Sequence, residues 1–560
     1  MNLTTVEQRH RDKAKYTLQN GKRKASKKIF DIFNFQSSIL IFASLCLCVF
    51  AVNLSCGSKP ADLRALIPAD SLVYLESNDL GAVMNAITER PAFREAAKTV
   101  PDFSVLNGVK LAVTVTGFET KELPVTDENS VLSFTPHFVA VLETNAWNFQ
   151  AVSFTQDRLG EFINQVYGGE VLLETSDKHD GKYFVWTAKD GRKAFALVQG
   201  SVVFFGNDET SIEKCLAVKR NEADSIAKNP KITDGDRLAF GYVSPDGIAQ
   251  IANIIGVKYG SEASDEPEVQ SAVAKILPQL LRNTISEVAW TADKTEQGIE
   301  DNYKIGTTPE VAQVFRETFL PNDPADPALF GLLGDLPSTT RYNLKDPQIA
   351  WRSVLLTLQK QTDPIAGKII GVLANTIFEP YGVQNPEMFL SGIESNFLTA
   401  KFDAEGEKPF VIATIRDNQK VMKSIVSGLK PFPRSAEHGI QFWQTDDNEI
   451  GAVFETNTII IGSVVGVGSG FSGGSLPGTS PNSDSLKHLT GSTAPITTVG
   501  RDDDIAAILV GVLSEARYAD AKEKTYFATE TRFDQKGIER RTVSDFGFIG
   551  WIITQFGKEE

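Results

Sequence analysis

The apolar and polar positions of this chain alternate between short runs typical of strands and longer runs with helical spacing. Residues 71–76 predict a strand, and Asn78-Asp79 then supply a cap for a helix over 80–88. The same order returns later, where a strand ending at Leu344 precedes Asp346-Pro347 and a helix over 348–358. The pattern therefore predicts the same strand and capped helix at two distant places in the chain.

A second pattern also occurs twice. The runs 138–142 and 149–154 predict a hairpin that leads into a helix. The runs 397–402 and 410–415 predict a second hairpin, again followed by a helix. Both hairpins come after a predicted strand and capped helix, so the two units keep the same order in the chain.

Three further correspondences keep that order. Trp186 matches Trp443 at a separation of 257 residues, and the same separation relates 246–251 to 503–508. The two Gly-Ile-Glu triplets that begin at Gly298 and Gly537 each fall at the turn of a predicted terminal hairpin. Ordered self-similarity of this kind indicates two copies of one domain.

The predicted fold class is α+β, because hairpins alternate with helices and strands often follow one another directly. We expect two tandem homologous domains of mostly antiparallel sheet with packed helices, at residues 60–318 and 319–560, joined near the breaker-rich stretch 320–324. Before them lie a basic lead at 1–37, expected to be disordered, and an apolar targeting segment at 38–56.

The apolar segment 38–56 follows a basic cluster and ends in small residues, which is the order of an export signal. The end of this segment, Leu54-Ser55-Cys56-Gly57, is similar to a lipobox, so we expect Cys56 to carry a lipid. An uncleaved signal-anchor and a buried core helix are the alternatives. The lipoprotein and the signal-anchor both place the rest of the chain outside the cytoplasm, facing the periplasm or the cell exterior.

The charge balance argues against a nucleic-acid partner. The chain carries 56 basic and 71 acidic residues, and beyond its first thirty positions 47 basic residues face 69 acidic ones, a net charge of −22. Such a surface repels phosphate backbones. Of the four cysteines only Cys215 lies beyond the apolar segment, so no disulfide is expected within the folded part, and helical spacing predicts Cys215 to be a core residue.

The glycine-rich stretch 466–474 contains a dinucleotide-type pattern and a nucleophile-elbow pattern around Ser472. Both mechanisms need a helix directly after a strand. Because Pro477 and Pro481 follow, we expect a loop inserted into the repeat, with a serine hydrolase using Ser472 as the alternative. His488 and Asp484 lie too close in sequence to complete a triad of the usual order.

The remaining polar candidates favour structural roles. No histidine or cysteine spacing fits zinc, and neither a metal nor a cofactor is expected. The run Asp502-Asp503-Asp504 precedes apolar residues at helical spacing, so it predicts a helix cap and not a cation site. His179 lies in a predicted hairpin turn. Four aromatic residues are candidates for a carbohydrate or lipid surface, although the repeat favours a core position for the pair Trp186 and Trp443. They are Trp147, Trp186, Phe442 and Trp443.

The apolar anchor, the opening Ile67-Pro68-Ala69-Asp70, the Arg90-Pro91-Ala92-Phe93 helix start and the two Gly-Ile-Glu hairpins together resemble an uncharacterised family of exported, lipoprotein-like bacterial proteins. The resemblance covers nearly the whole chain after Cys56. It implies a cell-envelope location and brings no catalytic residue.

We expect a membrane-tethered envelope protein, not an enzyme, whose duplicated domains bind a protein partner or a hydrophobic ligand. The alternatives are the hydrolase using Ser472 and a purely structural spacer that holds envelope components apart.

Overall fold

The computed structural model describes residues 62–555 except 98–99, 125–129, 233–234, 264–266, 323–335, 403–407, 433–440, 472–482, 503 and 515–523. The predicted lead, the apolar segment 38–56 and Cys56 lie outside the described residues. Within the described residues, no helix has both the length and the apolar character that crossing a bilayer requires.

Among the described residues, twenty strands belong to one sheet. The first ten are β1 (Val73–Ser77), β2 (Lys110–Pro124), β3 (Ser130–Glu143), β4 (Leu172–Lys178), β5 (Gly181–Thr187), β6 (Lys193–Gln199), β7 (Val202–Gly206), β8 (Ala239–Val243), β9 (Ile285–Lys294) and β10 (Ile299–Thr307). The next ten are β11 (Ser338–Asn343), β12 (Ile393–Lys401), β13 (Pro409–Ile415), β14 (Lys430–Pro431), β15 (Phe442–Gln444), β16 (Ile450–Glu455), β17 (Thr458–Ser463), β18 (Ile496–Asp502), β19 (Thr525–Phe533) and β20 (Gly537–Ser544).

The helices lie between the strands in sequence, and the longest of those described are α8 and α9. Up to residue 318 they are η2 (Leu63–Leu66), α3 (Leu80–Thr88), α4 (Pro91–Ala96), η3 (Ser104–Leu106), α5 (Asn148–Phe154), the π-helical turn η4 (Thr155–Leu159), α6 (Gly160–Val166), α7 (Glu209–Lys219), η5 (Ile226–Lys228), α8 (Pro245–Ala263), α9 (Pro267–Thr284) and α10 (Pro309–Thr318). After it they are α12 (Pro347–Lys360), α13 (Pro364–Thr376), η6 (Glu379–Tyr381), α14 (Pro386–Gly392), α15 (Asn418–Ser424), α16 (Val464–Phe471), α17 (Ser483–Gly491), α18 (Ile505–Leu513) and α19 (Gly547–Thr554).

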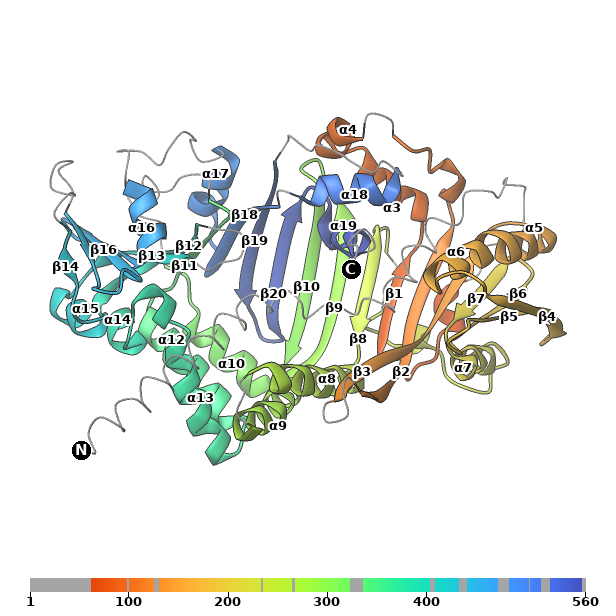
Figure 1. Cartoon of the computed structure of the whole chain (residues 1–560), viewed down its shortest axis with the longest axis horizontal. Coiled ribbons are helices and arrows are strands. Elements are labelled where there is room, and N and C mark those ends of the chain that lie inside the picture. The colour runs from red at the N-terminus through yellow and green to blue at the C-terminus, as the bar shows by residue number, and fades with distance from the viewer. Residues whose placement is uncertain are drawn as a thin grey trace.

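The sheet runs the full width of the molecule (Figure 1). Its spatial order is β4-β5-β6-β7-β3-β2-β1-β8-β9-β10-β20-β19-β18-β11-β12-β13-β17-β16-β15-β14. Every described pairing is antiparallel, and helices pack against the sheet. The predicted α+β class with mostly antiparallel sheet is confirmed.

The pairing pattern repeats: each pairing among β1 to β10 has a counterpart among β11 to β20 with both strand numbers raised by ten. For example, β1 pairs with β2 and β8, whereas β11 pairs with β12 and β18. The joint between the two sets is the β10–β20 pair, in which Ile299 lies opposite Ser544 and Ile305 opposite Ile538. The register of this pair is symmetric about the paired residues Asn302 and Arg541, as a twofold axis through them would produce.

Gly298 directly precedes β10 and Gly537 begins β20 at this joint, and both have positive φ, 151° and 142°. A Cβ on Gly298 would lie 2.1 Å from the carbonyl oxygen of Ser544, and a Cβ on Gly537 would lie 2.2 Å from that of Ile305. Only glycine permits so close a backbone approach. The two glycines predicted at hairpin turns therefore also allow the two sets of strands to join.

The terminal helices cross the joint. Helix α19 follows β20 but packs on β9 and β10, where Phe548 contacts Trp290 and Tyr303 edge-on. Buried Asp301 fixes the start of α19, because its carboxylate accepts hydrogen bonds from Trp290 Nε1 and the Phe548 N–H, both at 2.8 Å. Helix α10 follows β10 but packs on β19 and β20. Each terminal helix thus covers strands of the other set.

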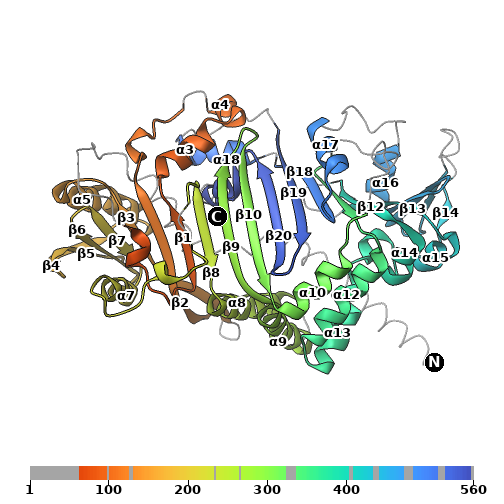
Figure 2. The ribbon, with the colours of Figure 1, turned by 180° about the vertical axis from the view of Figure 1, so that it is seen from behind.

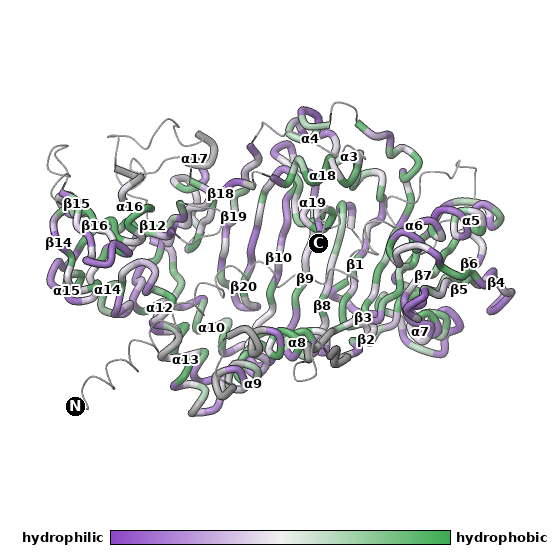
Figure 3. The backbone as a smooth tube through the Cα atoms, viewed as in Figure 1, coloured by the Kyte–Doolittle hydropathy of each residue, from purple (hydrophilic) through white to green (hydrophobic). Residues whose placement is uncertain are grey.

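Apolar cores lie on both faces of the sheet at its two ends. On one face the first core extends under α3 to α6, α18 and α19, and on the other face a second core lies under η2 and α7. Around β11 to β17 two further cores lie under α14 and α15 and under α16 and α17. Apolar strand segments at the ends give way to more polar segments in β10, β18, β19 and β20 (Figure 3). Seen from behind, the middle of the sheet carries no helix among the described elements (Figure 2).

One predicted hairpin is wrong. Residues 149–154 form helix α5, and β3 pairs instead with β2 and β7. The apolar run resembles a strand, but Ala151 and Phe154 face the core at helical spacing, and the Gln150 side chain accepts a hydrogen bond from the Trp147 N–H. The β12–β13 hairpin is confirmed.

The predicted helix caps are confirmed. Asp79 accepts a hydrogen bond from the Ala82 N–H, and Asp346 accepts one from the Ile349 N–H, both at 3.0 Å. Both terminal hairpins, β9–β10 and β19–β20, also form as predicted. These caps matter for the site, because α3 and α12 each line a cavity.

Candidate ligand-binding cavity

The glycine-rich stretch forms more structure than predicted. Helix α16 begins directly after β17 and contains Gly466, Gly468 and Gly470, so the loop prediction is wrong up to Phe471. A Cβ on Gly466 would lie 3.0 Å from the Lys408 carbonyl oxygen, so glycine here permits close packing on the strand below. Helix α16 follows β17 directly, just as α7 follows β7.

The chemistry proposed for that stretch has no geometric support among the described residues. The glycines lie inside and after α16, whereas a phosphate cradle needs them before the helix starts. Ser472 lies outside the described residues. Asp484 and His488 both belong to α17.

The acidic run also has a structural place. Asp502 ends β18, and Asp504 occupies the cap position of α18 without a side-chain hydrogen bond. Within the described residues, no group of three histidine, cysteine or carboxylate side chains is arranged to hold a metal ion.

Other sequence predictions fall in structural positions. Cys215 is buried, and burial raises the pKa of its thiol to about 12, so it is protonated at neutral pH. His179 has a positive φ in the tight β4–β5 turn, as predicted. Trp186 is buried and stacks on Phe184.

The other three aromatic candidates do not gather into one surface. Trp443 and Phe442 are half-buried against two different cores. Trp147 is 55% exposed on the far side of the molecule, at the start of α5.

A cavity of about 270 Å³ lies between α12, η6 and α14 on one side and β11, β12 and β13 on the other. Its walls are almost wholly apolar and rich in aromatic rings. They are formed by Phe319, Tyr342, Leu344, Pro347, Ala350, Trp351, Val354, Ile377, Phe378, Tyr381, Phe389, Leu390, Phe397, Thr399 and Val411. Known small-molecule sites begin at about 300 Å³, and an engineered cavity of about 150 Å³ already binds benzene.

The local sequence explains how the cavity is lined. Asp346 caps α12 and Pro347 fixes its first turn, so Ala350, Trp351 and Val354 turn one helical face toward the sheet. Ala350 is small and buried, and it leaves space where a larger residue would fill it.

Aromatic contacts give the walls a fixed shape. Tyr342 stacks on Phe397 with ring centroids 4.7 Å apart, and Trp351 meets Phe378 edge-on at 4.9 Å. Phe378 in turn contacts Tyr381 at 6.5 Å. Such pairs are favourable beyond the area they bury and restrict the rotation of the rings.

The walls carry no charged side chain among the described lining residues. The polar groups are the hydroxyls of Tyr342 and Tyr381, each hydrogen-bonded to Thr399, and Trp351 Nε1, which has no hydrogen-bond partner among the described residues. Burial raises the pKa of both tyrosines, that of Tyr381 to about 12, so both stay neutral at physiological pH. Burying an unpaired charge here would be costly, so the cavity suits a neutral apolar molecule.

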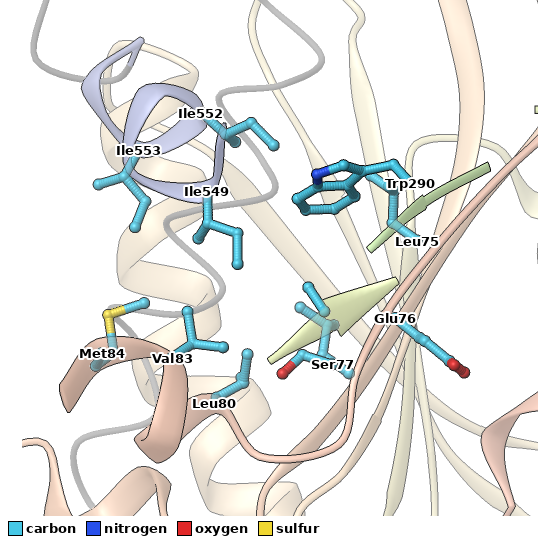
Figure 4. A pocket seen from close by; sticks show the side chains of 12 residues that line it. Leu75, Glu76, Ser77, Leu80, Val83, Met84, Trp290, Ile549, Ile552 and Ile553 are labelled. Carbon is cyan, nitrogen blue, oxygen red and sulfur yellow. The ribbon is translucent and has the colours of Figure 1, made fainter. Parts of the chain in front are cut away.

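A much smaller cavity, of about 40 Å³, lies under α3, against β1, β2, β8 and β9 (Figure 4). Counted from the capping aspartates Asp79 and Asp346, lining residues fall at the same three helix positions. They are Leu80, Val83 and Met84 in α3, and Pro347, Ala350 and Trp351 in α12.

The small cavity is filled from the far end of the chain. Ile549, Ile552 and Ile553 of α19 point toward it, opposite Val83 and Met84 (Figure 4). At the large cavity, Phe319, which ends α10, is the lining residue that comes from that helix. Helix α19 thus reaches far into the cavity under α3, whereas α10 contributes only Phe319 to the cavity under α12. Of these two cavities, only the one under α12 has room for a ligand of more than a few atoms.

Sequence reasoning missed this cavity. Its aromatic residues lie far apart in the chain, and each reads as an ordinary core residue. The one available signal was Ala350 at the position that Val83 holds in α3, a smaller residue inside an otherwise matching capped helix. The difference is visible only when the two helical segments are aligned at their capping residues, Asp79 and Asp346.

Comparison with known proteins adds little. No protein-family model matches the chain, and no curated protein matches it. A solved structure titled "Structure of crystal form I of TP0453" aligns at 10% identity and a TM-score of 0.21, covering 42% of this chain and 97% of its own. At that TM-score the likeness carries no argument about this protein.

Proposed function

We propose that this protein is a non-catalytic binding protein that holds one neutral, apolar small molecule in the cavity under α12. The observation that carries the proposal is the combination of volume and wall chemistry, about 270 Å³ bounded by aromatic and aliphatic side chains. A ligand that fills the cavity removes its apolar walls from water, which contributes about 25 cal/mol for each Å² of apolar surface buried.

The proposal includes tethering to a membrane of the bacterial envelope. It rests on the order of basic residues, the apolar segment 38–56 and Cys56 in the sequence, and on the resemblance to exported lipoprotein-like proteins. Metabolic labelling with an acyl chain tests this part. Labelled protein that loses its label on Cys56→Ala supports lipidation, whereas unlabelled soluble protein contradicts tethering.

The proposal also treats the halves 60–318 and 319–560 as copies of one domain. The repeated strand pairing and the symmetric register of the β10–β20 joint support it. Under this account the halves have diverged: α19 fills the cavity of the first half, and the cavity of the second half remains open for a ligand.

A pair of matched fluorescent probes tests ligand binding. N-phenyl-1-naphthylamine is neutral, and 8-anilinonaphthalene-1-sulfonate has the same rings with a sulfonate added. We expect the neutral probe to bind the full chain in detergent with one site, and the sulfonate to bind about tenfold more weakly or worse, because the cavity offers no countercharge. Equal binding of both probes would contradict the proposal. So would unchanged binding of the neutral probe to the Ala350→Leu variant.

A further inference from the structure

The outer face of α12 carries apolar and basic side chains in alternation. Ile349, Arg352, Leu356 and Lys360 are all exposed and recur at helical spacing, and we refer to them as the α12 stripe. Ile349 is 52% exposed and Leu356 is 55% exposed. Exposed apolar side chains that share a helix face with basic ones are typical of surfaces that bind the membrane interface.

The helix that carries the stripe also lines the cavity. Ala350, Trp351 and Val354 line the cavity from the opposite face of the same helix. Ile377, just beyond α13, both lines the cavity and is 61% exposed, so it marks where the cavity meets solvent. Figures 1 and 2 place α12 and α13 at one margin of the molecule, away from the middle of the sheet.

The charge of this region is opposite to that of the chain. Residues 347–378 carry three basic side chains, Arg352, Lys360 and Lys368, and one acidic one, Asp363, in a protein of net charge −15. The guanidinium of Arg352 lies 3.9 Å from Glu387, a long contact with the arginine 64% exposed. Lys360 and Lys368 are exposed as well. A basic, apolar surface is suited to anionic lipid headgroups.

We propose that the α12 stripe docks on the surface of an anionic lipid bilayer and so holds the cavity close to the lipids. Aliphatic side chains enter the headgroup boundary while arginine and lysine bind phosphates. A molecule dissolved in the membrane then has a short path to the cavity. This loading role rests on the proposed ligand binding, whereas docking rests on the stripe itself.

Photocrosslinking of the full chain in vesicles tests docking site by site. The vesicles contain equal parts of phosphatidylcholine and phosphatidylglycerol, with a trace of phosphatidylglycerol that carries a diazirine on one acyl chain. We expect crosslinks, mapped by mass spectrometry, in the peptide 347–378. Ile349→Ser with Leu356→Ser should reduce them about fivefold or more, and Lys360→Gln about fivefold.

The matched control is Phe149→Ser with Leu172→Ser, since these side chains are 70% and 62% exposed at the other end of the sheet. This variant should keep full crosslinking in 347–378. Crosslinks confined to the segment 38–56, or lost equally in the control, would overturn docking. Probe binding in detergent separates the two proposals: the stripe variants should retain it, and its absence in the unmodified chain would instead refute the cavity as a ligand site.

Discussion

Ala350→Leu is the most informative single substitution in the cavity. Ala350 is 1% exposed and lines the open space from α12. Leucine adds three carbon atoms and keeps good helix propensity. In a closely packed core such an addition is destabilising by about 1–3 kcal/mol. In a cavity of about 270 Å³ the new atoms instead have room.

The expected gain follows from burial. Three carbon atoms contribute about 2.4 kcal/mol at ~0.8 kcal/mol for each buried methylene. Restricting the new side chain costs about 0.5–1 kcal/mol. The ligand-free protein should therefore gain about 1.5 kcal/mol in free energy of unfolding. The same atoms occupy the ligand's space, so affinity for N-phenyl-1-naphthylamine should fall about tenfold or more.

Urea unfolding of the delipidated protein and a probe titration measure the two effects together. Val83→Phe is the control, because Val83 holds the same position in α3 beside a cavity of only about 40 Å³. That variant should lose about 1–3 kcal/mol and bind the probe normally. An Ala350→Leu protein that is less stable than the parent and binds the probe with unchanged affinity would refute the reasoning.

Two further predictions concern the joint between the halves. Burial raises the pKa of Asp301 to about 6 from an ordinary value of 3.8. The free energy of unfolding that this shift contributes is therefore present at low pH and is lost as the pH rises from about 4 to 6. The loss is about 3 kcal/mol in urea unfolding, and Asp301→Asn should remove this slope; parallel pH profiles would contradict it. Gly537→Ala should cost at least about 2 kcal/mol, because its Cβ would meet the Ile305 carbonyl. Gly191→Ala, with positive φ but open surroundings, should cost only about 1 kcal/mol, and equal losses would show that the close approach is unimportant.

Local signals in the sequence predicted much of the fold. The aspartates before α3 and α12 cap those helices as predicted, because a side-chain acceptor at that position acts within three residues. Gly298 and Gly537 mark two true hairpins. The buried positions of Trp186 and Cys215 also follow from local spacing.

Predictions failed where tertiary contacts decide. Residues 149–154 form a short apolar run like that of a strand, but β2 and β7 already occupy both edges of β3, so the segment packs as a helix. The helix over 464–471 forms despite three glycines, because Val467 is buried in the core below. The cavity itself depends on side chains from α12, η6, α14 and three strands, and no local pattern encodes an unfilled space among them.

The central claim is that a neutral apolar molecule occupies the cavity under α12. The most direct measurement is organic extraction of the full chain purified from its membrane, with mass spectrometry of the extract, alongside the Ala350→Leu variant. The account predicts about one neutral, apolar molecule per chain in the parent protein and strong depletion in the variant. An extract with no such molecule, or the same molecule in equal amount from both proteins, would contradict it.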